Sequence, residues 1–134
     1  MWSQRMFFLR KLKAVNVDTT ILDLFYKSVV QSVLAFCIVC WFGNLSEKDK
    51  KLVNRLAKSA RRLGCKDVVN FEELYEATVN KKRSTILKDE SHPLFMYYRF
   101  LPSNIRLSSI YCRTSRYKDS FVPSSIRLFN GSTL

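Results

Sequence analysis

The pattern of apolar and polar positions predicts two consecutive helices of opposite character between Asp18 and Leu63. The first helix, over residues 19–42, becomes almost wholly apolar, because residues 29–42 read VVQSVLAFCIVCWF. The second helix, over residues 46–63, is amphipathic. Its cationic side chains recur at steps of three or four, so at 100° per residue they fall within one narrow arc, separate from the apolar face. They are Lys48, Lys51, Arg55, Lys58 and Arg62.

The ends of both helices carry recognisable signals. Asp18 is placed to cap the first helix with its carboxylate, and Gly43 to end it in the left-handed conformation. Ser46 and Asp49 open the second helix with the spacing of a capping box, and Gly64 ends it. We expect the apolar helix to pack through one side and to be buried all round beyond Val33. That side comprises Ile21, Leu22, Phe25, Val29, Val33, Phe36 and Cys40.

Two further helices flank this pair. Apolar residues at helical spacing predict one over residues 2–15, and Asn70 with Glu73 opens another over residues 71–88. The basic cluster Lys81-Lys82-Arg83 on the latter is interpreted as solvated. The fold class is therefore mainly α: a small helical bundle of about four helices over residues 1–102, with an irregular basic C-terminal tail over residues 103–134. The abrupt opening on a helix suggests a fragment of a longer chain.

The charge of the 134-residue chain is strongly positive, with a formal net value of +12. Residues 1–66 hold 13 Lys and Arg against 4 Asp and Glu, a net charge of +9. Such a surface attracts an anionic partner, either nucleic acid or an acidic membrane. The stretch of residues 21–42 is interrupted by Asp23 and Lys27, which favours a buried core helix over a membrane span, so a membrane partner is not expected.

Candidate catalytic chemistry is sparse. Cys37 and Cys40 have the C-x-x-C spacing but lie in an apolar run without Gly or Pro, so we expect plain buried thiols. The single His92 has no acid or nucleophile nearby in the sequence and is interpreted as structural. We expect no cofactor, no metal and no small-molecule substrate. The absence of a signal peptide predicts an intracellular protein, nuclear or cytoplasmic.

The sequence favours binding to phosphates. The stripe on residues 46–63 has no acidic residue between Lys50 and Lys66, and an anionic ligand would relieve the repulsion among its charges. Ordinary solvation of a surface helix is the alternative. In the tail, arginines alternate with aromatic residues, which suits a single strand or a phosphate backbone, although a tail that wraps the helices would look similar. The candidate nucleic-acid-binding residues are the five of the stripe, together with Arg10, Lys11, Lys13, Arg113, Arg116 and Lys118.

Several segments in collinear order resemble the C-terminal part of non-LTR (LINE-type) retrotransposon polyproteins, of the kind common in fish genomes. They are QRMFFLRKLK (4–13), LFYKSVVQSVLAFCIVCWFGNLSEKDKK (24–51), SHPLF (91–95), LPS (101–103) and RTSRYKDSFVPSSIRLFN (113–130). The resemblance implies the thumb of a reverse transcriptase and the region after it, where basic helices grip the backbone of the template–primer duplex. In this sequence Asn104-Ile105-Arg106 follows LPS, so part of the family's basic cluster is missing.

The resemblance does not extend to catalysis. Polymerase chemistry needs clustered carboxylates that hold two metal ions, whereas this chain has no Tyr-x-Asp-Asp and its Asp residues are scattered. Tails of this type also resemble a short family named after the N-terminal domain of AlkB homologue 8, which implies dioxygenase or methyltransferase activity on alkylated nucleic acid. A two-histidine, one-carboxylate iron site cannot be built from His92 alone. We therefore expect a non-enzymatic remnant that binds nucleic-acid backbone without sequence preference.

A further alternative is an orphaned fragment or interaction module with no ligand. There, the exposed apolar surface of helix 19–42 would drive self-association.

Overall fold

The computed structural model describes residues 2–132, and over that range the chain folds into helices joined by turns, with one isolated bridge between Phe100 and Leu107. The mainly α fold predicted from the sequence is confirmed. The helices are α1 (Trp2–Ala14), α2 (Thr19–Phe25), the π-helix η1 (Tyr26–Gln31), α3 (Ser32–Ala35), α4 (Ile38–Trp41), the 3₁₀ turn η2 (Phe42–Asn44), α5 (Glu47–Arg62), α6 (Phe71–Lys88), the 3₁₀ turn η3 (Phe95–Tyr97), α7 (Ser115–Lys118) and α8 (Phe121–Ser132).

The chain divides into two compact units. The first contains residues 2–38 and 45–74, and the second contains residues 39–44 and 75–132. Residue 102, where the sequence analysis placed the domain boundary, lies within the second unit. The stripe on α5 belongs to the first unit, and the basic residues between 103 and 132 belong to the second.

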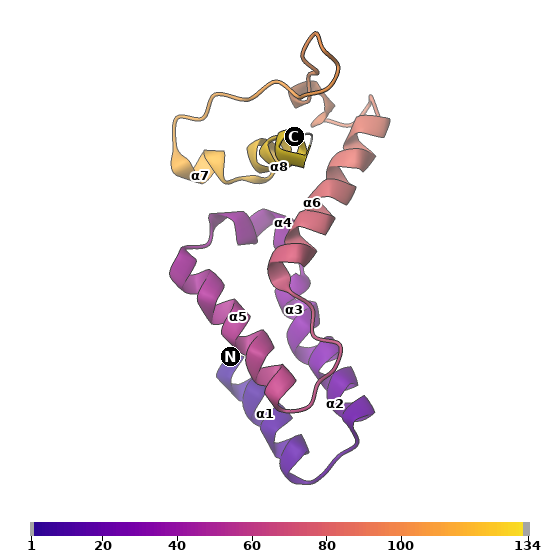
Figure 1. The fold of residues 1–134 in the computed structure, drawn as a ribbon, viewed down its shortest axis with the longest axis vertical. Coiled ribbons are helices and arrows are strands. Elements are labelled where there is room, and N and C mark those ends of the chain that lie inside the picture. Colours follow the sequence, from indigo (N-terminus) through magenta and orange to yellow (C-terminus); the bar gives the residue numbers. More distant parts are fainter. Residues whose placement is uncertain (1, 133–134) are drawn as a thin grey trace. The chain divides into compact units, whose positions relative to one another are not determined.

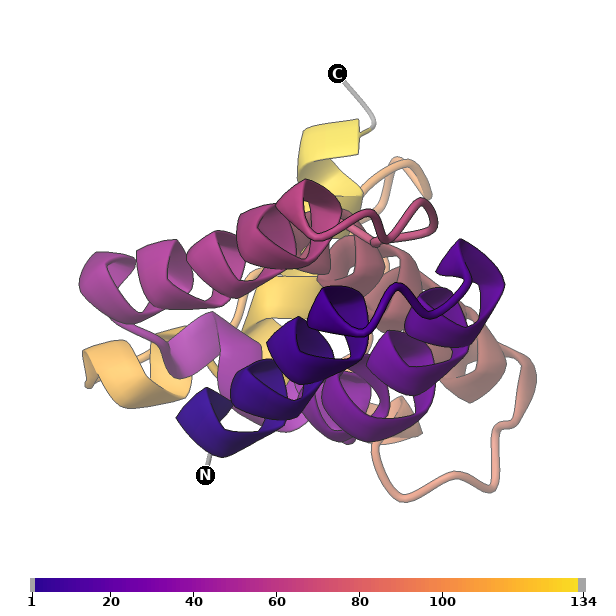
Figure 2. The ribbon, with the colours of Figure 1, turned by 90° about the horizontal axis from the view of Figure 1, so that it is seen from below.

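The first unit is a packed group of long helices. α1 lies against α2, η1 and α5 (Figures 1 and 2). Its core side chains include Met6, Leu9, Leu22, Tyr26 and Ala60, each no more than 2% exposed. The loop after α5 is fixed to α2 and η1, because the Lys66 amide donates to the Asp23 carboxylate of α2 at 2.8 Å and Lys27 of η1 pairs with Asp67 at 2.9 Å.

The continuous helix predicted over residues 19–42 is wrong. A wide π turn follows Phe25, and the Val29 carbonyl oxygen in that turn accepts a hydrogen bond from the Arg5 guanidinium of α1. The helix then ends at Ala35, because Phe36 has an extended ψ of 123° and Cys37 has a φ of 48°. The apolar run carries no Gly or Pro to announce either irregularity.

The predicted packing side of this segment is also wrong in part. Leu22 is buried as expected, but the other core positions are Tyr26, Val30 and Leu34, because the extra residue in each π turn rotates the face that follows. The expectation of complete burial beyond Val33 fails as well, with Val33 40% and Phe36 74% exposed.

Within the described residues, no single helix has both the length and the apolar character needed to cross a membrane. One bent pair, formed by the segments Thr19–Ala35 and Ile38–Asn44, reaches that length and composition.

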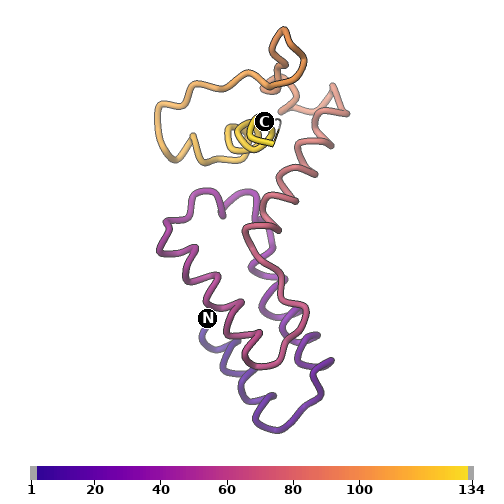
Figure 3. Tube along the Cα trace, in the orientation of Figure 1, coloured from indigo at the N-terminus to yellow at the C-terminus, as the bar shows by residue number. Residues whose placement is uncertain are grey.

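The second unit has a hydrophobic core of its own. Ile86, Tyr98, Leu107 and Ile126 form its centre, with partly buried apolar residues of α6 and α8 around them. The trace in Figure 3 shows the irregular run that joins η3 to α7. The tail predicted to be irregular is therefore irregular only in its first part, since α7 and α8 follow, and Pro123 to Ile126 of α8 are buried.

Of the predicted helix-end signals, some act as expected and others do not. Asp18 occupies the N-cap position of α2, but its carboxylate makes no capping hydrogen bond. Gly64 ends α5 with a φ of 106°. Gly43 does not adopt a left-handed conformation; it lies in η2, where a Cβ would come within 2.5 Å of the Asp119 carbonyl oxygen. Gly43 is therefore needed for space and not for its φ angle.

Candidate nucleic-acid interface

The α5 helix begins on a well-formed cap. The Ser46 hydroxyl accepts a hydrogen bond from the Asp49 amide at 3.2 Å and donates to the Asp49 carboxylate at 2.7 Å. Glu47 and Asp49 lie near the positive end of the helix dipole, and Arg61 and Arg62 lie near its negative end. The sequence-predicted bounds of 46–63 therefore hold, because the signals that set them are local.

The stripe points directly away from the core of the first unit. Val53, Ala57 and Ala60 are the buried positions of α5. At 100° per residue the five stripe positions span an arc of about 80°, centred about 170° from those buried residues. All five stripe side chains are exposed, as the sequence predicted: Lys48, Lys51, Arg55, Lys58 and Arg62.

The remaining basic residues of α5 are held by local partners. Lys50 pairs with Glu47 at 3.1 Å, and the Arg61 guanidinium donates to the Val68 carbonyl oxygen at 3.1 Å. By contrast, within residues 2–132 no side chain of the stripe forms an ion pair or a hydrogen bond. The unpaired positive charge of α5 is thus concentrated on one exposed face.

The basic residues of α1 do not share one face. Arg10, Lys11 and Lys13 are all exposed, but the Lys11 ammonium lies over the Phe7 ring at 5.3 Å from its centroid. Lys13 lies at the other side of α1, where its Nζ atom approaches Gly64 at the C-terminal end of α5. Of the three, Lys13 is thus positioned beside the helix that carries the stripe, while Lys11 is directed elsewhere.

The tail residues form a separate candidate surface in the second unit. Arg113 precedes α7, and Arg116 and Lys118 lie on it; all three are exposed. Thr114 caps α7, because its hydroxyl oxygen accepts from the Tyr117 amide at 3.2 Å. This short helix therefore fixes the position of two of the three predicted tail residues.

The predicted solvation of the Lys81-Lys82-Arg83 cluster is wrong for Arg83, which is only 7% exposed. Its guanidinium donates to the Asn80 side-chain oxygen at 2.8 Å and to the Ser125 carbonyl oxygen at 3.1 Å, and it lies 4.7 Å from the Phe129 ring centroid. Burial lowers the pKa of Arg83 from its ordinary value. Its position, four residues after Val79, was the available signal for burial.

The burial expected of Cys37 and Cys40 is also wrong, since both are exposed. The helix break at Phe36 and Cys37 supplies a turn that no Gly or Pro announces. Cys65 is buried, and this burial raises the pKa of its thiol. Across residues 2–132, no three side chains of His, Cys, Asp or Glu gather into a group that could hold a metal ion.

The sequence places Tyr111 among the isolated apolar anchors of the tail, and this interpretation is wrong, because its side chain is 88% exposed. It lies beside a pocket of the second unit that also includes Lys118. The alternation of aromatic and basic residues in the tail was the signal, but it could not show which aromatic residue stays in solvent.

One protein-family model matches the N-terminal part of the first unit. The family described as the N-terminal part of alkylated DNA repair protein alkB homolog 8 matches residues 3–32, which form α1, α2, η1 and the first residue of α3. The predicted resemblance to that family is thereby supported for these helices. No curated protein and no solved structure matches the chain. The resemblance to retrotransposon polyproteins receives no support from these comparisons and stays a prediction.

Proposed function

We propose that this protein binds the sugar–phosphate backbone of nucleic acid through the exposed stripe of α5 and has no catalytic role of its own. One observation carries the proposal: five cationic side chains occupy one arc of α5, opposite its core face, and lack partners within residues 2–132. Like charges at helical spacing of three and four residues repel one another, so the free helix bears a cost that phosphate groups would remove.

Such an interface would recognise the negative charge of the backbone and not the base sequence. Lys and Arg that neutralise phosphates release condensed counterions, which makes the affinity fall steeply with salt. Base discrimination needs side chains placed against base edges in a groove, and the stripe has only Lys and Arg on a convex helix face. We therefore expect similar affinities for unrelated duplex sequences of equal length.

The experiment compares two quadruple variants of the full chain in anisotropy titrations with a labelled duplex. The test variant replaces Lys51, Arg55, Lys58 and Arg62 by Gln. The control variant replaces four exposed lysines outside the stripe by Gln, namely Lys66, Lys81, Lys82 and Lys88. Both variants lose four positive charges, so a general charge effect would weaken them equally. The test variant should bind about tenfold or more weakly than the control, whereas equal affinities would refute the interface.

The sequence resemblance to LINE-type polyproteins supports a more specific version. In that version the bound nucleic acid is a template–primer duplex, and the first unit corresponds to the helical thumb of a reverse transcriptase. A higher affinity for an RNA–DNA hybrid than for duplex DNA and single strands of equal length would support this version. Equal affinities would refute it and would leave the general proposal of backbone binding standing.

The family match favours a second candidate function in alkylated-nucleic-acid repair. The matched residues contribute Leu9, Leu22 and Tyr26 to the core of the first unit, so their evident role is to pack helices. An activity of the kind implied by the family name would require binding of iron and 2-oxoglutarate, or of a methyl donor. Calorimetric titration of the full chain with Fe²⁺ and 2-oxoglutarate tests it: binding would favour this candidate, and no heat of binding would exclude the dioxygenase version.

The exposed apolar residues of the first unit favour the remaining alternative, an interaction module that self-associates. Phe7, Phe8, Leu24 and Phe36 are between 49% and 74% exposed. Size-exclusion chromatography with light scattering distinguishes the alternatives. A monomer at micromolar concentration supports an autonomous binding module, whereas oligomers that dissociate on changing Phe36 to Ser would support self-association.

A further inference from the structure

The second unit contains an open pocket of about 340 Å³ between its irregular segment and its last helices. Residues 109–112 line one side, and Lys118, Pro123, Ile126 and Arg127 line the other. The volume is at the lower end of the range typical of small-ligand pockets. All of these residues lie in one unit, so the pocket is formed without any contribution from the stripe.

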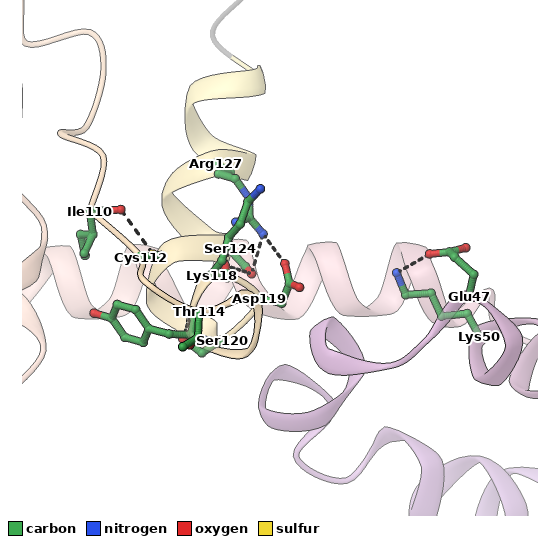
Figure 4. Close-up of polar contacts among 11 residues, drawn as sticks. Glu47, Lys50, Ile110, Cys112, Thr114, Lys118, Asp119, Ser120, Ser124 and Arg127 are labelled. Carbon is green, nitrogen blue, oxygen red and sulfur yellow. Dashed lines mark hydrogen bonds and ion pairs between the residues drawn. The ribbon is translucent and has the colours of Figure 1, made fainter.

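The pocket combines an apolar floor with a fixed cationic wall. Pro123 and Ile126 are buried in α8. Arg127 is held in place by three acceptors: its guanidinium donates to the Lys118 carbonyl oxygen at 2.7 Å, to the Asp119 carboxylate at 3.1 Å and to the Ser124 hydroxyl at 3.2 Å (Figure 4). Asp119 offsets the charge of Arg127.

The ammonium of Lys118 remains available to a ligand. Its backbone is fixed, because its amide donates to the Thr114 carbonyl oxygen at 3.0 Å and its carbonyl oxygen accepts from Arg127. Its side chain makes no ion pair or hydrogen bond among residues 2–132. The pocket therefore presents one unpaired positive charge, on a side chain whose backbone is held in place.

Tyr111 supplies the complementary feature. Its ring is 88% exposed, and it belongs to the segment that lines the pocket. A burial-driven fold gains nothing from a ring in that position, whereas a planar ligand could stack on it. A flat apolar ring, an apolar floor and one free ammonium together match a planar base that carries a phosphate.

We propose that this pocket binds one nucleotide of a single-stranded nucleic acid, with the base against Tyr111 and a phosphate at Lys118. The inference rests on the proposed function and deepens it, since it adds a contact that distinguishes unpaired from paired strands. Base stacking on an aromatic side chain tolerates every base, because each base has a π face. In a duplex the same face is covered by neighbouring base pairs, so only a single strand can offer it.

A free anion would use this pocket differently from a nucleotide. Inorganic phosphate could interact with Lys118 but would gain nothing from Tyr111. An abasic oligonucleotide carries the backbone without the base and isolates the same difference within a polymer. These two probes separate phosphate attraction from recognition of the base.

The test uses the full chain and a labelled oligothymidylate of eight nucleotides, with an abasic oligonucleotide of equal length as the probe control. Tyr111→Ala should weaken binding of the oligothymidylate by about 5- to 150-fold, the loss expected for one stacked base. Binding of the abasic strand should not change. Tyr97→Ala, which removes another half-exposed ring of the second unit outside the pocket, should leave both affinities unchanged.

The salt dependence provides an independent measurement on Lys118. Lys118→Gln should lower the salt slope for the single strand by about 0.7, the value for one phosphate contact, while Tyr111→Ala should leave the slope as it is. A Tyr111→Ala variant that binds the oligothymidylate as tightly as the native chain would overturn the inference. The inference would also be overturned if inorganic phosphate shielded the Lys118 ammonium from an amine-modifying reagent while Tyr111→Ala changed the affinity for neither oligonucleotide.

The quadruple stripe variant separates this inference from the proposed function. If the pocket is right and the stripe is wrong, Tyr111→Ala weakens single-strand binding while the stripe variant binds duplex normally. If the stripe is right and the pocket is wrong, duplex binding is weakened in the stripe variant and Tyr111→Ala has no effect. Each of the two proposals therefore fails in a different assay.

Discussion

Arg83 of α6 donates a hydrogen bond to the Ser125 carbonyl oxygen of α8 at 3.1 Å, and this bond joins two helices across the core of the second unit. Nearby, the Tyr98 and Ser125 hydroxyls form a hydrogen bond of 2.7 Å. Both contacts meet at Ser125, which is fully buried. A polar network within an apolar core therefore fixes how α8 lies on α6.

Replacing Arg83 by Met should destabilise the protein by about 2–3 kcal/mol. The change keeps much of the side-chain volume but leaves the Ser125 carbonyl oxygen without its charged donor, and hydrogen bonds to charged groups are worth about 1.5–3 kcal/mol. Urea denaturation followed by circular dichroism measures the loss. Lys82→Met, at an exposed neighbouring position, is the control and should change stability by less than about 0.5 kcal/mol. Equal stabilities of the two variants would show that the buried guanidinium contributes nothing.

Gly43→Ala should destabilise the protein by about 1–3 kcal/mol, the usual cost of overpacking. The added Cβ would lie 2.5 Å from the Asp119 carbonyl oxygen and 2.8 Å from the Tyr75 hydroxyl, and a backbone oxygen cannot move aside cheaply. Gly131→Ala is the matched control, since a Cβ there meets nothing within 4 Å. That control should be neutral or more stable, because Ala favours helix over Gly. Thermal denaturation that ranks Gly43→Ala with Gly131→Ala would contradict the packing described for η2.

Tyr26→Phe should leave the free energy of unfolding unchanged at neutral pH or raise it by about 1 kcal/mol. The Tyr26 hydroxyl is buried and has no hydrogen-bond partner within residues 2–132, so Phe removes an unsatisfied polar atom. Measured destabilisation of more than about 1 kcal/mol would instead reveal a bonded hydroxyl.

The same variant has a defined pH dependence. Burial raises the pKa of Tyr26 from 10.0 to about 12. Above pH 10 the unfolded chain releases this proton while the folded chain retains it, so the native protein loses stability as the pH rises from 10 towards 12. Tyr26→Phe lacks that loss, and its advantage should therefore grow over this interval in denaturation experiments. A constant difference between the two proteins from neutral to alkaline pH would contradict the raised pKa.

The cysteines should differ strongly in their reaction with a thiol reagent. Cys37 and Cys40 are exposed, whereas Cys65 is buried and its pKa is raised by burial, which lowers both its access and its thiolate fraction. In the folded protein, Cys37 and Cys40 should be modified first and Cys65 only at the rate of unfolding. Mass spectrometry of peptides from a time course measures each site. Modification of Cys65 as fast as Cys37 would show that the first unit opens readily.

Local signals in the sequence predicted the bounds of α5 and α6 well. Ser46, Gly64 and Asn70 act on backbone groups within a few residues of themselves, so their effects do not depend on the rest of the fold. Charge periodicity also predicted the exposure of the α5 stripe, because the apolar residues on the opposite side of the same helix fix which face is buried.

Tertiary contacts decided the features that the sequence could not predict. The π turn at Tyr26 is completed by Arg5, which lies 24 residues before the carbonyl it binds. The break at Cys37 has no Gly or Pro, and the burial of Arg83 depends on a carbonyl oxygen 42 residues away. Pairings over such distances leave no periodic trace in a single sequence.

If the stripe of α5 contacts phosphates, duplex binding must depend on salt through those five side chains. The logarithm of the association constant should fall linearly with the logarithm of the salt concentration. Changing Lys51, Arg55, Lys58 and Arg62 to Gln should reduce the magnitude of that slope by about 3.6, at about 0.9 for each phosphate that is no longer neutralised. The control with Lys66, Lys81, Lys82 and Lys88 changed to Gln should keep the native slope. An unchanged slope in the stripe variant would contradict the proposed interface.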